Sequence, residues 1–369
     1  MFVDRFMRTE LGSLTSIKTG KLDANASSEN GIYPFFTCAV EPLKIDSYSY
    51  DCECVLVAGN GDLNVKYYNG KFDAYQRTYI IESKDKSKLT VPYLYYFLES
   101  YIETLRNQSI GGIIKYIKLG NLTNAPIPVL SIKEQNEIVK TLDKAKSIIT
   151  HIRTQLEKLD LLVKARFVEM FGDPVSNPYN WEKISLGKLA EIKIGPFGSL
   201  LHKEDYVQNN HALINPSHII NSKVFADMKL TVSDEKYEEL RAYQLFTGDV
   251  VMGRRGEMGR CAVITESGLL CGTGSMIIRT NGRLKADYIQ KIISFPSFKK
   301  TIEDMAVGQT MPNLNVPIVS KFMIICPPIE VQEQYYSFIE KTDKSKVAMQ
   351  KELGKAQTLF DSLMQEYFG

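Results

Sequence analysis

The sequence predicts a mixed α/β (α+β) protein with an internal duplication. Its two globular domains are separated by two long antiparallel helices that form a coiled coil. Three observations support this pseudo-twofold internal repeat. A segment near the start recurs 175 residues later, and the helical part recurs at an offset of 197. Each copy begins with a strand-like residue pattern and ends with a helical one. We expect four regions: a first globular domain at 1–128, a central helical region at 129–172, a second globular domain at 173–326 and a C-terminal helical region at 327–369.

The repeat is clearest in two places. Residues 11–20 and 186–195 are identical at six of ten positions. Residues 131–172 and 328–369 match at nine of 42 positions without a gap. Because the offset grows from 175 to 197, the second copy should carry about 22 extra residues, which we place near 199–245.

The globular parts are rich in Gly, Asn, Tyr and β-branched residues. Short apolar runs bounded by turn residues predict strands at 54–57, 78–81, 249–252 and 275–278.

The helical parts carry apolar residues in alternating steps of four and three, which is typical of a coiled-coil seam. In the first copy the seam positions are Ile138, Leu142, Ala145, Ile149, Ile152, Leu156, Leu159 and Val163. In the second copy they are Tyr335, Ile339, Thr342, Lys346, Met349, Leu353, Ala356 and Phe360. Neither helix, of roughly 35–40 residues, should be stable alone in water, so we expect the two to pack against each other.

The composition favours a globular protein without a membrane span. The 369 residues are 44% apolar and 24% charged, and no run approaches the roughly 18 apolar residues that a span needs. The first residues show no secretory signal, so we expect a cytoplasmic location. Six cysteines and four histidines have no metal-ligand spacing and predict neither disulfides nor a metal site.

Enzyme motifs are missing from the sequence. Asn177-Pro178-Tyr179 and Asn215-Pro216-Ser217 lack the second proline of a methyltransferase loop, and Gly59-Asn60-Gly61 lacks the third glycine of a dinucleotide loop. The sequence contains no HExxH and no GxSxG. We therefore predict no catalytic residues.

Several segments together resemble the specificity subunits of type I restriction-modification systems. The segments are Phe171-Gly172-Asp173-Pro174, Asn177-Pro178, Trp181-Glu182, Ser185 to Leu189, Gly195-Pro196-Phe197-Gly198-Ser199, Asp205-Tyr206, Gly248 to Met252 and Pro327 to Gln334. The resemblance covers nearly the whole chain. The first copy departs from it, with Gly20-Lys21-Leu22-Asp23 in place of the Gly-Pro-Phe-Gly-Ser segment and Leu130-Ser131-Ile132 in place of Pro-Pro-Leu.

The resemblance implies a DNA-reading function without catalysis. The two globular domains would be target-recognition domains, each reading one half of a split site in double-stranded DNA, and the helices would set the gap. The partners would be two methyltransferase (M) subunits and restriction/translocase (R) subunits. This chain would need no cofactor, since S-adenosylmethionine, ATP and Mg²⁺ would be bound by the partners, and the methyltransferase would flip the target adenine.

Candidate DNA-binding residues lie in loops that offer side chains suited to base edges. In the second copy the loop of residues 253–260 presents three guanidinium groups, and a second-rank segment follows Gly195; the candidates are Arg254, Arg255, Arg260, Phe197, Ser199, His202 and Lys203. The counterpart in the first copy, residues 59–68, offers amides, and the turn Tyr75-Gln76-Arg77 is second-rank; the candidates are Asn60, Asn64, Lys66, Tyr67, Gln76 and Arg77.

Other interpretations remain open at this level. The matching segments Gly111-Gly112-Ile113 and Gly308-Gln309-Thr310 are interpreted as tight turns at the junction of domain and helix. The net charge of +2 is low for a DNA-binding protein. The alternative function is a coiled-coil scaffold whose globular ends bind protein and not DNA; an intrinsic nuclease would need a carboxylate pair with a lysine that does not align between the copies.

Overall fold

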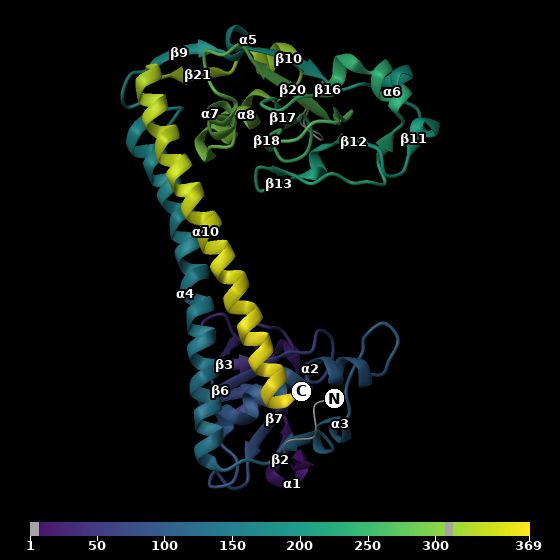
Figure 1. Ribbon diagram of the computed structural model, residues 1–369, viewed down its shortest axis with the longest axis vertical. Coiled ribbons are helices and arrows are strands. Elements are labelled where there is room, and N and C mark those ends of the chain that lie inside the picture. Colours follow the sequence, from purple (N-terminus) through teal and green to yellow (C-terminus); the bar gives the residue numbers. More distant parts are fainter. Residues whose placement is uncertain (1–6, 307–312) are drawn as a thin grey trace. The chain divides into compact units, whose positions relative to one another are not determined.

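The computed structural model describes residues 7–306 and 313–369, and the chain divides into two units (Figure 1). Unit 1 consists of residues 1–158 and 344–369, and unit 2 of residues 159–343. Each unit therefore contains one globular domain and part of each of the two long helices, α4 (Ile132–Phe171) and α10 (Ile329–Phe368).

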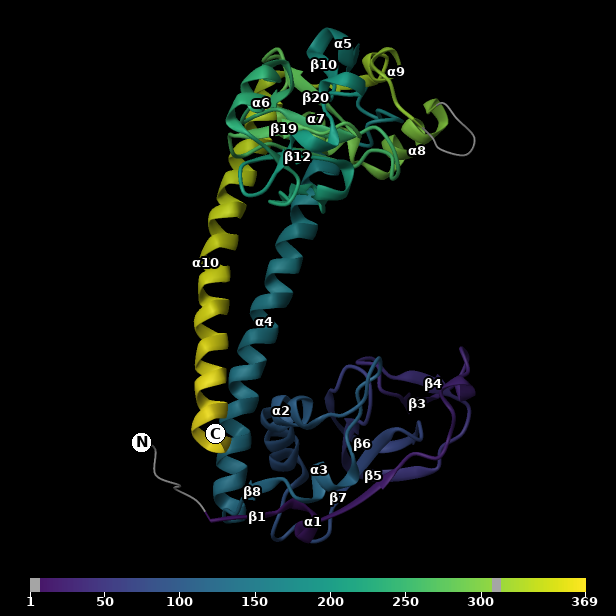
Figure 2. The ribbon, with the colours of Figure 1, turned by 90° about the vertical axis from the view of Figure 1, so that its right-hand side faces the viewer.

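The globular part of unit 1 is built on a six-stranded sheet of order β2-β7-β5-β6-β3-β4, antiparallel except for the parallel pair β3 and β6. Its strands are β2 (Thr15–Thr19), β3 (Tyr33–Phe36), β4 (Leu43–Ile45), β5 (Tyr50–Ala58), β6 (Val65–Ala74) and β7 (Thr78–Ser83). Alternate residues of β5 face two cores. Val55 and Val57 pack with helix α2 (Val91–Gln108), which is seen in Figure 2, and Leu56 packs with Phe72 on the other face.

Short elements complete unit 1. Strand β1 pairs with β8 in an antiparallel ladder that precedes α4. The short elements are β1 (Arg8–Glu10), α1 (Leu11–Leu14), η1 (Ala24–Ala26), α3 (Leu119–Thr123) and β8 (Pro126–Pro128). The guanidinium of Arg8 donates to the carbonyl of Gly369 at 2.6 Å, so the start of the described chain lies beside its end.

The globular part of unit 2 has a four-stranded antiparallel sheet of order β10-β20-β17-β18. One face packs on helices α7 (Ala286–Ile293) and α8 (Pro296–Met305), and the other packs on a second, five-stranded sheet of order β11-β15-β12-β19-β16. The strands of the first sheet are β10 (Ala190–Ile194), β17 (Val250–Gly253), β18 (Cys261–Val263) and β20 (Ser275–Thr280). Those of the second are β11 (Tyr206–Val207), β12 (His211–Ile214), β15 (Thr231–Val232), β16 (Gln244–Leu245) and β19 (Leu269–Cys271).

The other elements of unit 2 are short. Strands β9 and β21 pair with each other as β1 and β8 do, and β13 and β14 form a hairpin. These elements are β9 (Glu182–Ser185), α5 (Leu186–Leu189), η2 (Gly198–Leu200), η3 (Lys203–Asp205), η4 (Pro216–His218), β13 (Ile219–Ile220), β14 (Lys223–Val224), α6 (Asp234–Glu239), η5 (Arg241–Tyr243), α9 (Val316–Ser320) and β21 (Met323–Cys326).

The structure confirms the internal repeat. Elements α1 and β2 recur as α5 and β10 at an offset of 175, and β7, α3 and α4 recur as β20, α9 and α10 at an offset of 197. Strands β5 and β17, which lie between these elements in the chain, are offset by 195, because Val55 pairs with Ile81 as Val250 pairs with Ile278. Hence 20 of the 22 extra residues lie between β10 and β17, close to the predicted place, and two lie between β17 and β20.

The two long helices also match their prediction. Each is 40 residues long. All sixteen predicted seam positions are buried or half-buried. In unit 1 the first part of α4 packs with the last part of α10, through Ile138, Leu142 and Phe368. In unit 2 the last part of α4 packs with the first part of α10, where the rings of Phe171 and Tyr335 are 5.1 Å apart. The helices are therefore antiparallel.

Candidate nucleic-acid interface

Most of the predicted DNA-binding residues lie at one end of the main sheet in each unit. Because neighbouring strands are antiparallel, β5 ends where β7 and β6 begin, and β17 ends where β20 and β18 begin. Strands β2 and β10 also end there. We call this the loop end of each unit. The loops that follow or precede these strands carry Asn60, Asn64, Gln76, Arg77, Phe197, Arg254, Arg255 and Arg260, and Lys66 and Tyr67 lie at the start of β6.

One loop at each loop end is tied to a second segment in the same way. In unit 1 Ile117 N donates to Gly59 O at 2.9 Å, and Asn60 forms a backbone bridge with Tyr116. In unit 2 Leu314 N donates to Arg254 O, also at 2.9 Å, and Arg255 forms the bridge with Asn313. Asn60 and Arg255 therefore occupy equivalent positions in the two units.

The three arginines of the unit 2 loop differ in their surroundings. Arg254 is half-buried, its Nε donates to Asn313 Oδ1 at 3.1 Å, and burial beside Arg255 lowers the pKa of Arg254. Arg255 is exposed, and no residue in the described part of the chain pairs with its guanidinium. Among the residues that the structure describes, Arg255 is thus the arginine of this loop whose guanidinium has no partner.

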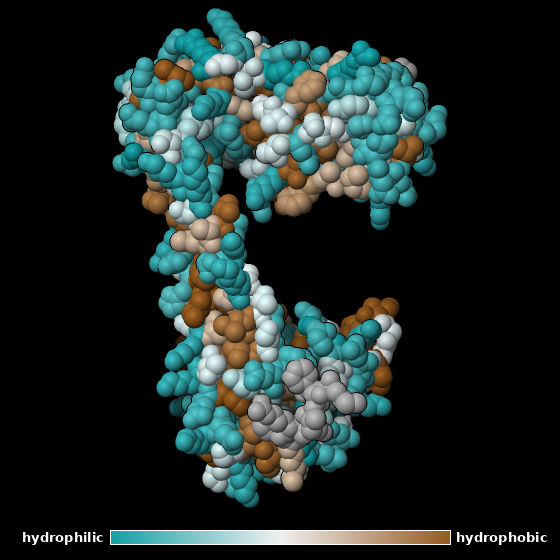
Figure 3. All heavy atoms as spheres, in the orientation of Figure 1, coloured by the Kyte–Doolittle hydropathy of each residue, from teal (hydrophilic) through white to brown (hydrophobic). Residues whose placement is uncertain are grey.

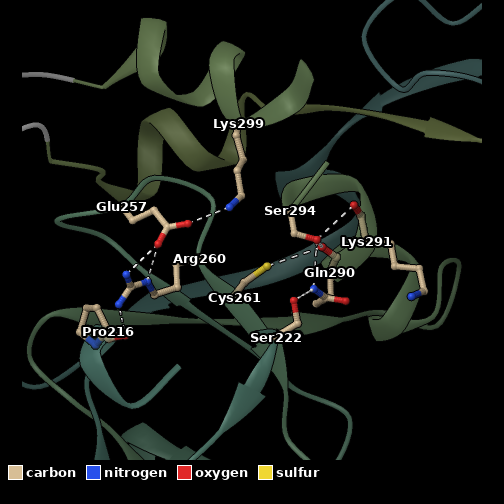
Figure 4. A network of polar contacts seen from close by, with 9 residues as sticks. All are labelled: Pro216, Ser222, Glu257, Arg260, Cys261, Gln290, Lys291, Ser294 and Lys299. Atoms are coloured by element: carbon tan, nitrogen blue, oxygen red, sulfur yellow. Dashed lines mark hydrogen bonds and ion pairs between the residues drawn. The ribbon is translucent and has the colours of Figure 1, made fainter. Parts of the chain in front are cut away.

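Arg260, in contrast, is held in a network of ion pairs (Figure 4). Its Nη2 lies 2.7 Å from Glu257 Oε2, and its Nη1 donates to the carbonyl of Pro216 at 3.1 Å. Glu257 also pairs with Lys299 at 2.9 Å. Lys299 and Arg260 together lower the pKa of Glu257, so this carboxylate stays charged and holds both cations. Arg260 and Glu257 therefore fix the loop against η4 and α8.

The unit 1 candidates also differ in their surroundings. Asn64 Nδ2 donates to the carbonyls of Cys38 and Asp62, and its Oδ1 accepts from Lys66. Burial lowers the pKa of Lys66, and Tyr67 donates to Glu53 Oε1 at 2.8 Å. Burial and this carboxylate raise the pKa of Tyr67 to about 12.

These three side chains are committed to internal contacts. In the part of unit 1 that the structure describes, the amide of Asn60 has no side-chain partner. Asn60 is therefore the free amide of the loop, in the position that the free Arg255 has in unit 2.

The second-rank candidates of unit 1 lie beside the Asn60 loop. The carbonyl of Arg77 accepts from Gly59 N at 2.8 Å, which places the exposed turn Gln76-Arg77 next to the Asn60 loop. The equivalent carbonyl of Gly274 accepts from Arg254 N at 3.0 Å. After β10, Phe197 is 62% exposed, and His202 and Lys203 are exposed at the start of η3. The side chain of Ser199 lies outside the described part of the structure.

One structural interpretation from the sequence was wrong. Gly111-Gly112-Ile113 is not at the junction of domain and helix, because α3 and β8 separate it from α4. It lies at the loop end, where Lys115 O accepts from Gly61 N at 3.0 Å. The sequence gives no local sign of this contact between residues more than 50 positions apart. The matching segment, Gly308-Gln309-Thr310, is outside the described residues.

No metal centre or membrane span is found within residues 7–306 and 313–369. No three His, Cys, Asp or Glu side chains there lie close enough to hold a metal ion, and no helix is long and apolar enough to cross a bilayer. All six cysteines are free, and Cys54, Cys261 and Cys271 are buried. Burial raises the pKa of Cys261 to about 12, which leaves it a poor nucleophile.

Two equivalent domains thus present different polar side chains, Asn60 and Arg255, at one matched loop. The chain belongs to the type I restriction modification DNA specificity domain family, whose model matches residues 4–160 and 178–356. This membership makes it a DNA-specificity protein of a type I restriction-modification system.

Individual relatives agree with this family. The chain is 26% identical to the type I restriction enzyme EcoDI specificity subunit of Escherichia coli, over 96% of this chain and 85% of the relative. It is 20% identical to the MjaVIII specificity subunit of Methanocaldococcus jannaschii, over 68% and 63%.

Solved structures show the same fold. The S subunit from M. genitalium matches with a TM-score of 0.59 at 16% identity, over 100% of this chain and 98% of that one. A chain from a structure of type I R-M complex assembly and conformational transition matches with a TM-score of 0.63 at 14% identity, with the same coverage.

Proposed function

We propose that this chain is the non-catalytic DNA-reading subunit of a type I restriction-modification complex and that each unit reads one half of a bipartite site. The observation that carries the proposal is the matched position of Asn60 and Arg255 at the two loop ends. One fold is used twice, and the side chain at the matched position differs. Two different half-sites are therefore expected.

The chemistry of these two side chains suggests what each unit reads. An arginine guanidinium can donate two parallel hydrogen bonds to N7 and O6 of guanine in the major groove. An asparagine amide can donate to N7 and accept from N6 of adenine. We assign a guanine contact to Arg255 and an adenine contact to Asn60. The exposed Arg77, His202 and Lys203 would contact phosphates and fix the register.

Catalysis is assigned to partner subunits. Two M subunits would bind S-adenosylmethionine and methylate adenine after flipping it out of the duplex. R subunits would bind ATP and Mg²⁺ and carry out translocation and cleavage. The role of this chain would be to select the DNA and to hold these partners on it. The names of the relatives, which describe specificity subunits of restriction enzymes, support this division.

The test is methylation with and without the partner. The purified chain with S-adenosylmethionine and mixed duplex DNA should give no N6-methyladenine. The same chain expressed with its methyltransferase should methylate one split motif, which methylation-sensitive sequencing of the host genome would identify. Methylation by the chain alone would refute the division of labour, and methylation without a split motif would refute the two-part reading.

The alternative of a protein-binding scaffold has no observation in its favour. A scaffold would not require a free guanidinium and a free amide at equivalent positions of two loops. Binding of the chain to generic duplex DNA should weaken steeply with salt, because each phosphate contact releases counterions. A salt-independent or absent interaction, with or without the methyltransferase, would favour the scaffold.

A further inference from the structure

The loop between α2 and α3 of unit 1 carries a cluster of exposed apolar side chains. Ile113 is fully exposed, Ile114 is 61% exposed, and Ile110 and Tyr116 are 43% and 37% exposed. Figure 3 shows apolar atoms gathered at the outer end of this loop. Single exposed apolar residues are ordinary, but a cluster of four on one loop indicates a contact surface.

The loop is closed and has a defined shape. Ile110 N donates to Tyr116 O at 3.0 Å, and Tyr116 N donates to Ile110 O at 2.8 Å. Gly111 has a φ of +120°, and a Cβ there would lie 2.5 Å from the carbonyl of Ile114. A side chain at 111 would prevent the turn. The backbone therefore holds Ile113 and Ile114 outward, and we call residues 111–115 the apolar tip.

The apolar tip lies directly beside the loop that carries Asn60. Lys115 O accepts from Gly61 N, and Tyr116 forms the backbone bridge with Asn60. Ile113 is two residues from Lys115, which is at most about 7 Å along the chain. Since base pairs are about 3.4 Å apart, the tip can reach about two base pairs from a base held by Asn60.

The charge around the tip suits DNA. Lys115 and Lys118 are exposed. The nearby carboxylate of Asp62 is paired with Arg106 at 3.1 Å. An apolar tip beside lysines and a free amide matches the edge of an A·T pair in the major groove, where adenine offers N6 and N7 and thymine offers its C5 methyl group.

We infer that the apolar tip is a second specificity element of unit 1, in which Ile113 and Ile114 contact the C5 methyl group of a thymine within about two base pairs of the adenine read by Asn60. This inference rests on the proposed function, because it requires that the loop end of unit 1 face DNA. By contacting the C5 methyl group, the tip would distinguish thymine from cytosine at its position. The amide of Asn60 does not make this distinction there.

Replacement of thymine by uracil tests the contact, since uracil lacks only the methyl group. The full chain with its methyltransferase is used to enrich a randomised duplex library, and each thymine of the enriched duplex is then replaced in turn. Loss of one buried methyl group should weaken binding about four-fold at one or two thymines of one half-site. Ile113→Ala combined with Ile114→Ala should remove this sensitivity, and Ile113→Val should retain it.

The matched control is Ile32→Ala, since Ile32 is another isoleucine of unit 1 and is 78% exposed. It should leave the preference for thymine over uracil unchanged. The inference is overturned if uracil has no effect at any thymine, or if the effect survives in the double variant. Loss of bound methyltransferase in the double variant, with thymine preference intact, would make the tip a protein-docking surface. A wild-type complex that enriches no sequence would refute the proposed function itself.

Discussion

At the scale of single residues, the environment of a side chain decides whether it can read DNA. Arg254, Arg255 and Arg260 lie within seven residues of one another and look equivalent in the sequence. Arg254 is bonded to Asn313, and Arg260 is bonded to Glu257 and Pro216. A guanidinium that already has partners must lose them before it can bind a base. Within residues 7–306 and 313–369, Arg255 has no side-chain partner to lose.

We predict that Arg255→Ala weakens specific binding by about 1–3 kcal/mol, because a bidentate contact with guanine is lost. The loss should affect one position of one half-site only. It can be measured by competition between duplexes that differ at single positions. Arg260→Ala is the control in the same loop and should reduce stability without changing the preferred bases. Equal loss of preference at both half-sites would contradict the assignment of Arg255 to unit 2 alone.

We predict that Glu257→Gln strengthens binding to generic duplex DNA. The change leaves Arg260 and Lys299 without their carboxylate, so the loop end gains one net positive charge. The slope of log affinity against log salt should steepen by about 0.9 for each new phosphate contact. Fluorescence anisotropy at several salt concentrations would measure it, and an unchanged slope would show that this network does not face DNA.

The pH dependence of this network has a definite sign. Because the pKa of Glu257 is lowered in the folded protein, the ion pairs add stability above the ordinary glutamate pKa. That contribution should be lost as the pH falls through the lowered value, and Glu257→Gln should make the acid side of the stability profile flatter.

At the scale of elements, the sequence predicted four of the strands, the two long helices and the repetition, because these depend on local periodicity. The seam from Ile138 to Val163 is an example, since heptad spacing alone defines the buried face. The partners of the loop side chains could not be predicted. The bond between Gly61 and Lys115 joins residues far apart in the chain, and only the folded sheet brings them together. The ion pairs of Glu257 could not be predicted from the sequence either, because exposed charged residues show no periodic pattern.

We predict that Gly20→Ala or Gly195→Ala destabilises its unit by about 1–3 kcal/mol or more, because close packing leaves no room. The two glycines are equivalent in the repeat. A Cβ at Gly20 would lie 2.1 Å from the carbonyl of Ala74, and one at Gly195 would lie 2.1 Å from that of Gly272. Gly120→Ala is the control, since nothing lies within 4 Å of its Cβ position. Thermal unfolding would measure the difference, and equal stability of Gly20→Ala and Gly120→Ala would contradict the packing argument.

At the scale of the whole molecule, the two helices are shared between the units. Unit 1 contains α4 up to Lys158 and α10 from Lys344, and unit 2 contains the remainder of both. The chain thus passes between the units twice, in opposite directions, through two helices of equal length. The length of this pair is a property that can be changed without touching either loop end.

The last prediction is that this length sets the gap between the half-sites. Insertion of seven residues after Lys158 and seven after Asp343 would keep the seam in phase and add about 10.5 Å of helix pair, at 1.5 Å per residue. With base pairs about 3.4 Å apart, the non-specific gap should grow by about three base pairs, while both half-sites keep their bases. Three base pairs also rotate one half-site by roughly 100° about the DNA axis, so affinity should fall. The same insertion in α10 alone is the control and should abolish sequence-specific methylation, because the two helices then differ in length by seven residues. Sequencing of methylated DNA gives the result, and an unchanged gap with full activity would show that the helices do not set the spacing.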